Sequence, residues 1–100
     1  MQAIINNNIK TIESLCKQHK VKNLYAFGSV LTKDFKANSD IDLLVDFEGV
    51  DFNNYADNFF DFKFSLEDIL KRKIDLLENK AINNPYLRGN IEQNKQLIYG

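Results

Sequence analysis

Residues 24–47 read LYAFGSVLTKDFKANSDIDLLVDF, and most of the information about the fold lies in this stretch. It opens with four apolar residues, 24–27, and Gly28 ends them; a run of that length suits a buried β-strand. It closes with residues 41–47 (IDLLVDF), which predict a second strand. We therefore expect a small sheet that is built outward from these two strands.

The polar segment between the two strands predicts a turn and a loop. Ser29 is a favourable helix N-cap, so a short helical turn can follow over residues 29–35. Residues 36–39 (KANS) then read as a polar loop that leads into the second strand.

Helices and further strands are expected on either side of this unit. Apolar residues at three- and four-residue steps predict amphipathic helices over 2–20 and 52–70, the second with a heavily aromatic face. Residues 73–78 (KIDLLE) predict a third strand, and residues 96–99 predict a short closing strand.

A last helix is expected over 83–92, with Pro85 near its first turn, where a missing N–H costs little. Helix and strand then alternate four times, which indicates an α/β (α+β) fold with helices packed on a small mixed sheet. One hundred residues suffice for one domain and not for two, so we expect residues 1–100 to form a single domain.

Composition excludes several classes of protein. A hydrophobic fraction of 44 % argues against disorder. The net charge is −1 and the only dense basic run, 71–73, is flanked by acidic residues, so long nucleic acid is not expected as the main partner. Cys16 and His19 are the only residues of their types, which excludes an intrachain disulfide and Cys/His zinc sites. No apolar run approaches the ~20 residues of a membrane span. We expect a cytoplasmic protein with no membrane partner.

Three acidic residues stand where β-strands can bring them together. Asp40 and Asp42 are two residues apart at the start of the second strand, so their side chains point to one face. Asp75 lies between Ile74 and Leu76, which can pack on the opposite face of the third strand. Close carboxylates repel unless a cation lies between them. Since Mg²⁺ binds carboxylates and substrate phosphates, the three residues predict a site for two Mg²⁺ ions if the strands pair.

Gly28 and Ser29 suit the phosphate half of such a site. Glycine lets a phosphate approach the backbone, the start of a helical turn attracts anions, and the Ser29 hydroxyl can bond a terminal phosphate oxygen. Taken singly, each signal has an ordinary explanation: an Asp-x-Asp pair is often a solvated strand end, and Asp75 can pair with Lys73 or Arg72. The combination in this order is far more specific.

Other residues have a structural reading that we favour over a functional one. Asp46 shares the face of Asp42, but we expect solvent exposure at the strand end. The aromatic face of helix 52–70 is expected in the core, although the surplus of aromatic residues leaves room for a partner-binding patch. Residues 71–73 are expected to be a solvated helix end, with phosphate steering as the alternative. His19 is expected to lie at a helix end and Cys16 in the core.

Taken together, these motifs resemble the nucleotidyltransferase fold of the DNA polymerase β superfamily. Gly28-Ser29 is followed by ten residues, then Asp40-x-Asp42, then a third Asp in a later apolar strand. The closest resemblance is to the minimal nucleotidyltransferase (MNT) proteins of prokaryotes, and it covers nearly the whole chain. It implies that metal binding and catalysis fall to Asp40, Asp42 and Asp75, and nucleotide binding to Gly28, Ser29 and Lys33.

The chain departs from the family after Gly28-Ser29. Many members carry a Gly-Ser-Arg-Ala-Arg-Gly run, whereas this chain has Val30, Leu31, Thr32 and Lys33 in its place. A guanidinium clamp on the triphosphate is therefore missing, and Lys33 is a point-charge substitute for it.

The resemblance also implies a function and a partner. MNT proteins are typically antitoxins that inactivate HEPN-domain ribonuclease toxins by transferring AMP from ATP to a tyrosine. The resemblance therefore implies that this chain is a Mg²⁺-dependent protein adenylyltransferase in a type VII-like toxin–antitoxin pair. Its substrate would be ATP and its partner a HEPN-domain toxin. The missing arginines leave an alternative, a catalytically weak antitoxin that neutralises its toxin by binding alone. Transfer to a small molecule such as an aminoglycoside would need an acceptor pocket, for which the chain is short.

Overall fold

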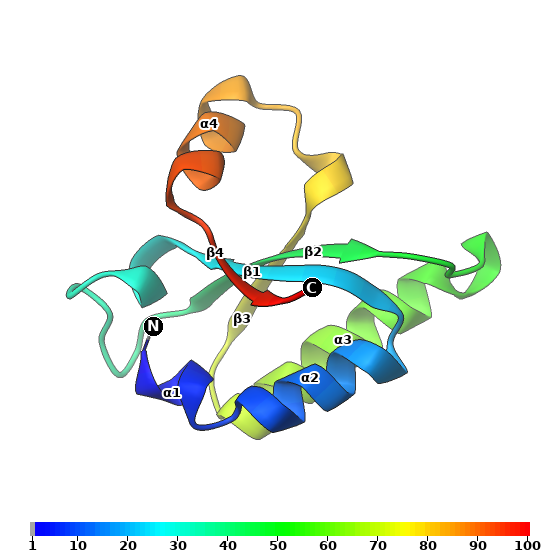
Figure 1. Ribbon diagram of the computed structural model, residues 1–100, viewed down its shortest axis with the longest axis horizontal. Helices are drawn as coiled ribbons and strands as arrows, with labels where there is room; N and C mark the ends of the chain where they lie inside the picture. The colour runs from blue at the N-terminus through cyan, green and yellow to red at the C-terminus, as the bar shows by residue number, and fades with distance from the viewer. Residues whose placement is uncertain (1) are drawn as a thin grey trace.

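The computed structural model describes residues 2–100 and contains one four-stranded mixed sheet in the order β3-β2-β1-β4. β1 (Val21–Phe27) lies antiparallel to both β2 (Ile41–Phe47) and β4 (Gln96–Tyr99). β3 (Ile74–Glu78) runs parallel to β2. The predicted mixed sheet flanked by helices is confirmed (Figure 1).

The helices are divided unequally between the two faces of the sheet. α1 (Ala3–Asn6), α2 (Ile9–Gln18) and α3 (Tyr55–Leu70) lie below it in Figure 1, and α4 (Pro85–Asn94) stands alone above it. Three short 3₁₀ turns lie in the connections: η1 (Gly28–Leu31), η2 (Phe52–Asn54) and η3 (Asn79–Ala81). Within residues 2–100 no helix has the length and apolar character needed to cross a membrane.

The first helix, predicted over 2–20, is in fact interrupted. The side-chain Nδ2 of Asn8 donates to the carbonyl oxygen of Ile4 at 2.8 Å, and the backbone N–H of Asn8 bonds instead to Ile5 at 3.1 Å. Asparagine side chains compete with the backbone for helical carbonyls in this way. The prediction of one continuous helix was therefore wrong, and α1 and α2 are separate.

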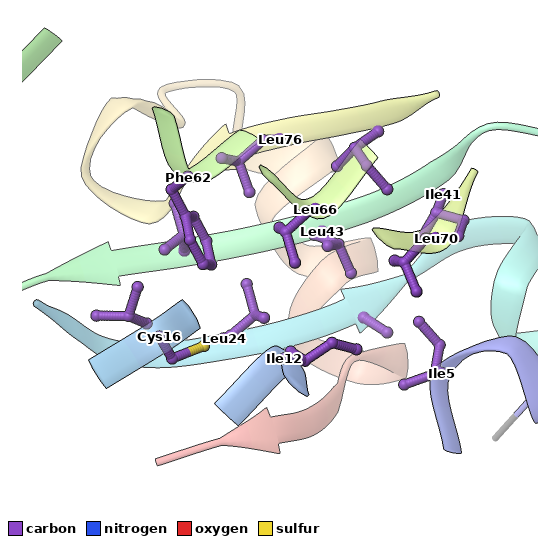
Figure 2. Packing of buried hydrophobic residues seen from close by; sticks show 14 of the residues in the cluster. Ile5, Ile12, Cys16, Leu24, Ile41, Leu43, Phe62, Leu66, Leu70 and Leu76 are labelled. Carbon is purple, nitrogen blue, oxygen red and sulfur yellow. The ribbon is translucent and has the colours of Figure 1, made fainter. Parts of the chain in front are cut away.

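The main core lies between the sheet and the three helices below it. β2 contributes Ile41, Leu43 and Val45, all essentially buried, and α3 contributes Phe62 (Figure 2). Cys16 lies in the same core, as expected, and its burial raises the pKa of the thiol to about 12.

The aromatic residues of the 52–70 segment divide between the core and the surface. Phe62 is fully buried, but Phe52 is 94 % exposed, so the expectation that it belongs to the core face was wrong. Phe52 lies in η2, before α3 begins, where the helical period no longer places it toward the sheet. Phe60 and Phe64 are also exposed and stack with their ring centroids 6.0 Å apart.

The opposite face of the sheet has a smaller apolar layer under α4. Leu44 of β2 and Ile91 of α4 are buried, yet neither belongs to the main core cluster. Side chains alternate along a strand, so Asp42 and Asp46 share the face of Leu44. The acidic residues of β2 therefore lie on the side of the sheet that α4 only partly covers.

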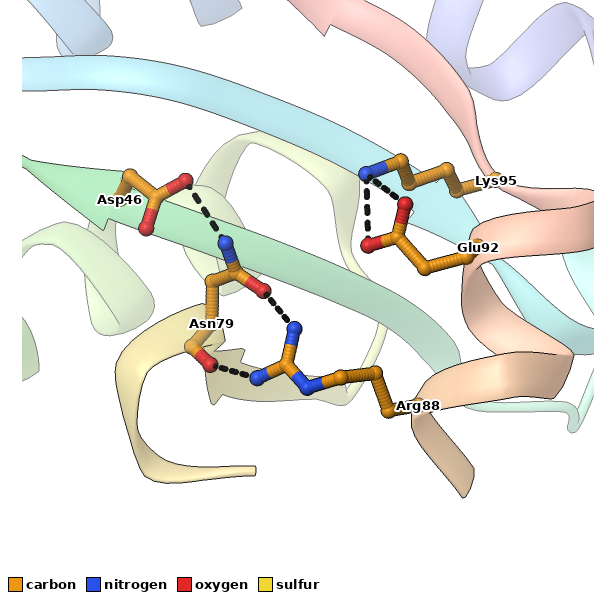
Figure 3. A network of polar contacts seen from close by, with 5 residues as sticks. All are labelled: Asp46, Asn79, Arg88, Glu92 and Lys95. Atoms are coloured by element: carbon orange, nitrogen blue, oxygen red, sulfur yellow. Dashed lines mark hydrogen bonds and ion pairs between the residues drawn. The ribbon is translucent and has the colours of Figure 1, made fainter. Parts of the chain in front are cut away.

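Arg88 anchors α4 to η3 through a small polar network (Figure 3). Its guanidinium donates to the side-chain oxygen of Asn79 at 3.1 Å, to the Asn79 carbonyl at 2.6 Å and to the Ile82 carbonyl at 3.1 Å. Asn79 in turn donates from Nδ2 to Asp46 at 3.3 Å. The network ties α4, through η3, to β2.

We expect Arg88→Lys to lower the free energy of unfolding by about 1 kcal/mol, because a lysine ammonium cannot reproduce the forked donors of the guanidinium. Urea denaturation of the two proteins measures the difference. Lys80→Arg, the reverse exchange at an exposed position of η3, is the control and should leave the midpoint unchanged. An unchanged midpoint for Arg88→Lys would show that packing alone holds α4.

Candidate active site

Asp42 and Asp75 lie directly beside each other on neighbouring strands. They are partners in the parallel register of β2 and β3, so both side chains stand on the α4 face of the sheet. Asp42 is half-buried and Asp75 is exposed. Burial, the charges of Asp75 and Asp40, and a hydrogen bond with the Asp75 side chain raise the pKa of Asp42 to about 6. The site therefore concentrates negative charge where it is poorly solvated.

No basic side chain within residues 2–100 neutralises this charge. The ion pairs there join Lys71 to Asp68 and Lys95 to Glu92, so the alternative in which Asp75 pairs with a neighbouring basic residue is not what the structure shows. An uncompensated pair of carboxylates suits a divalent cation, and Mg²⁺ takes all its ligands from oxygen.

The carboxylates do not form a complete metal cage. Within the described chain no three acidic, histidine or cysteine side chains converge as a preformed metal group. Asp40 is exposed and acts on Asp42 by its charge. Mg²⁺ is commonly held by one or two carboxylates plus substrate phosphates, so the Asp42–Asp75 pair fits an ion that arrives with a nucleotide.

Arg72 holds the loop that leads to Asp40, a role that the sequence did not reveal. Its Nη2 donates to the Lys36 carbonyl at 2.6 Å and its Nε to the Ser39 carbonyl at 3.2 Å. Its guanidinium also lies 4.4 Å from the centroid of the Phe35 ring. We had expected a solvated helix end here. The available signal was that Arg72 lies two residues before β3, the strand that pairs with β2 beside Asp42.

Gly28 brings the backbone against the Asp42 carboxylate at the end of β1. Phe27 is the register partner of Asp42, and Gly28 follows with φ of +75°. A Cβ on Gly28 would lie 2.3 Å from Oδ2 of Asp42, a separation that real side chains do not adopt. Only glycine therefore permits this approach of backbone and carboxylate.

Ser29 is the second residue of η1, which begins at Gly28 and ends at Leu31, so the helical turn predicted over 29–35 with Ser29 as N-cap was wrong in its bounds and its cap. The backbone N–H and the hydroxyl of Thr32 both donate to the Ser29 carbonyl, at 2.9 and 3.0 Å. Across residues 2–100 nothing bonds the Ser29 hydroxyl itself, which leaves it available to a ligand. The predicted strand–glycine–turn arrangement is what the structure contains.

A cavity of about 720 Å³ opens beside this turn. Its lining includes Gly28, residues 30–33 with Lys33 among them, and Gln2. Asn90, Asn94 and Gln96, from α4 and β4, complete it. The volume is within the usual range for ligand pockets. Lys33 thus lines the cavity together with Gly28, which lies against Asp42.

Asp46 does not join the acidic pair. Its carboxylate accepts a hydrogen bond from Asn79 and is half-buried, so it belongs to the anchor of α4. Solvent exposure was predicted for it, and the structure shows a structural contact instead. His19 lies at the C-terminal end of α2, with ring Nδ1 2.8 Å from the Leu15 carbonyl oxygen, as expected for a helix end.

Comparison with known proteins identifies the family. The model of the family described as "Polymerase beta, Nucleotidyltransferase" matches residues 10–100. A protein of Methanocaldococcus jannaschii named "putative protein adenylyltransferase" is 40 % identical over 86 residues, which cover 85 % of this chain and 82 % of the relative.

Solved structures share the fold. A structure described as a "putative minimal nucleotidyltransferase" is 26 % identical, with a TM-score of 0.76 over 92 % of this chain and 90 % of that one. A chain from a complex of a tri-AMPylated Shewanella oneidensis HEPN toxin with its MNT antitoxin is 19 % identical, with a TM-score of 0.65 over 95 % and 71 % of the two chains. The chain therefore belongs to the polymerase β nucleotidyltransferase family, as a minimal nucleotidyltransferase domain.

Proposed function

We propose that this chain transfers AMP from ATP, with Mg²⁺, to a tyrosine hydroxyl of a HEPN-domain toxin and so acts as its antitoxin. The observation that carries the proposal is the uncompensated Asp42–Asp75 pair directly beside the Gly28 turn. Two kinds of relative support it: the M. jannaschii protein is named for protein adenylyl transfer, and the S. oneidensis complex contains an AMPylated HEPN toxin with an MNT antitoxin.

In this proposal the acidic residues hold the metal and receive a proton. Asp40, Asp42 and Asp75 would hold two Mg²⁺ ions, which would neutralise charge on the reacting phosphate. The tyrosine oxygen attacks the α-phosphorus, the bond from that phosphorus to the bridging β-oxygen breaks, and pyrophosphate leaves. The tyrosine proton passes to the exposed carboxylate of Asp75.

The turn after β1 binds the other end of the nucleotide. The backbone at Gly28 and the free hydroxyl of Ser29 bind the β- and γ-phosphates, and the Lys33 ammonium offsets their charge from within the adjoining cavity. Donors on one side and carboxylates on the other orient the triphosphate, so that the α-phosphorus lies at the acidic pair.

Incubation with ATP, Mg²⁺ and a HEPN-domain protein encoded beside this chain tests the proposal. We expect intact-mass spectrometry to show the partner gaining AMP units, and its ribonuclease activity to fall in step. Well-folded proteins that form a complex without any gain in mass would contradict adenylyl transfer.

The alternative, neutralisation by binding alone, is favoured by the residues Val30, Leu31 and Thr32 where many relatives carry a basic run. The double change Asp40→Asn with Asp42→Asn separates the two functions. If transfer is the mechanism, the double variant should bind the toxin but no longer neutralise it; if binding suffices, neutralisation persists. Asp46→Asn is the control, because it neutralises a carboxylate of β2 outside the acidic pair, as Asp42→Asn does within it, and keeps an oxygen acceptor for Asn79.

A further inference from the structure

The cavity beside Gly28 has the donor chemistry of an anion site. Its lining includes one cation, Lys33, and four side-chain amides, of which those of Asn90 and Gln96 donate no hydrogen bond within residues 2–100, and none of its lining residues is acidic. This contrasts with the carboxylates of Asp42 and Asp75, which lie on the other side of Gly28 and do not line the cavity. A ligand with several negative charges matches the cavity better than a neutral or cationic one.

The side-chain amide of Asn90 is held by Asn94, which lies one turn further along α4. Nδ2 of Asn94 donates to the Asn90 carbonyl at 2.9 Å and to Oδ1 of Asn90 at 2.8 Å. The Asn90 oxygen is thereby occupied, while its Nδ2 has no partner within the described residues. Asn94 therefore orients Asn90 so that two N–H groups remain for a ligand.

The other amides are placed by the sheet and by the loop. Gln96 starts β4 opposite Ala26, two residues before Gly28, and its side chain is exposed. Gln2 has a different role, because its Nε2 donates to the Thr32 carbonyl at 3.0 Å and so steadies the loop after η1. Gln96 and Asn90 thus add donors from β4 and α4 to the cavity that Lys33 also lines.

The register of the sheet gives the order of these groups. Asp75 pairs with Asp42, Asp42 pairs with Phe27, and Gln96 pairs with the neighbouring Ala26. The ends of the four strands therefore lie side by side, but Gln96 shares the face of Ala26, which is opposite to the face of Asp42 and Asp75. Asn90 of α4 and Gln96 line the cavity from opposite faces of the sheet, and Gly28 lines the same cavity while it lies against Asp42, so a triphosphate bound at Gly28 is next to both the amides and the acidic pair.

We propose that Asn90, oriented by Asn94, and Gln96 complete the polyphosphate subsite of this chain and replace the guanidinium donors that many relatives carry after Gly28-Ser29. The inference rests on the proposed function, and it adds donors from α4 and β4 to the Gly28–Ser29 turn. Amide N–H groups bind phosphate oxygens without adding charge. The anchor of α4 at Arg88 therefore also positions the phosphate donors.

The test is binding of Mg²⁺-tripolyphosphate and of Mg²⁺-ATP to the full chain, measured by calorimetry and by ¹⁵N NMR. In the unaltered protein the side-chain amide signals of Asn90 should shift on addition of tripolyphosphate, which has no base. Asn90→Asp should weaken tripolyphosphate binding by about tenfold or more, since a donor becomes an anionic acceptor. Gln93→Glu, the same change at an exposed position of α4 outside the cavity, is the matched control and should leave affinity within about twofold.

Three outcomes would overturn the inference. Equal tripolyphosphate affinity in Asn90→Asp and Gln93→Glu would remove Asn90 from the phosphate site while the proposed function stands. If Asn90→Asp changed the relative affinities for ATP, GTP and CTP but left the affinity for tripolyphosphate unchanged, the cavity would be a nucleobase pocket. If the unaltered chain binds neither tripolyphosphate nor ATP, the proposed function fails as well.

Discussion

Asp42→Asn is expected to abolish nucleotidyl transfer and at the same time to stabilise the folded chain at neutral pH. The amide removes a charge that the proposed metal site needs, so we expect the rate of transfer to fall on the order of 10³-fold. The free energy of unfolding should rise because the carboxylate of Asp42 is half-buried beside Asp75 and, in the metal-free protein, no cation offsets its charge.

The effect on stability depends on pH in a definite direction. The pKa of Asp42 rises from 3.8 in the unfolded chain to about 6 in the folded one, so the folded state binds the proton more tightly. This contribution favours folding fully below pH 3.8 and is lost as pH rises through about 6. At pH 7 the unaltered protein has lost this contribution, because Asp42 is ionised. An asparagine at this position stays neutral at every pH and avoids the loss. We expect Asp42→Asn to raise the free energy of unfolding at pH 7 by about 1 kcal/mol. This is less than the full pKa shift of Asp42 would give, because the carboxylate remains partly in contact with solvent.

Thermal unfolding at pH 5 and pH 8 without metal, combined with the mass assay, measures both effects. One kcal/mol corresponds to about 4–8 °C in a chain of this size. The Tm of Asp42→Asn should exceed that of the unaltered protein at pH 8, and the gap should narrow at pH 5. Asp46→Asn is the control that changes the same charge outside the acidic pair. A variant that is less stable at pH 8, or that retains transfer, would contradict the assignment of Asp42.

Gly28→Ala is expected to damage both the fold and the site. The backbone has φ of +75°, and the new methyl group would lie 2.3 Å from Oδ2 and 3.2 Å from Cγ of Asp42. The positive φ costs about 1 kcal/mol, and relief of the contact adds about 1–3 kcal/mol. Because the carboxylate must move to make room, we expect transfer to fall by about a hundredfold as well.

Gly49→Ala separates the two contributions. Gly49 has nearly the same backbone conformation, with φ of +78°, but nothing lies within 4 Å of a Cβ built there. It should therefore show the cost of the positive φ alone, with transfer intact. Urea denaturation gives the two free energies, and the mass assay gives the two rates. Equal losses of stability in both variants would mean that Gly28 is needed for its φ and not for its contact with Asp42.

The elements that the sequence predicts best are those whose pattern is local. Residues 41–47 and 96–99 were predicted with their observed bounds because apolar residues there are compact and clearly bounded. β1 begins at Val21, three residues earlier than predicted, since Lys22 and Asn23 interrupt the apolar run and the register shifts between Val21 and Asn23. An irregular register hides the alternation on which such predictions depend.

Part of the candidate site could also be predicted from the sequence, and part of it could not. The proximity of Asp42 to Asp75 and of Gly28 to Asp42 follows from strand pairing, so period and order sufficed to predict it. Arg72 and Asn90 could not be found from spacing, because their contacts depend on how the end of α3 and the whole of α4 lie against the sheet. A basic residue before a strand and an asparagine in a helix have many ordinary explanations.

The parallel pairing of β2 with β3 has a consequence for how the chain acquires activity. The residues that meet at the sheet end come from positions as far apart as Gly28 and Gln96, and α3 must cross over before Asp75 can reach Asp42. Such distant contacts form late, after the entropy of closing long loops has been overcome. The acidic pair therefore exists only in a chain whose α3 has already brought β3 alongside β2, and it cannot form from β2 alone.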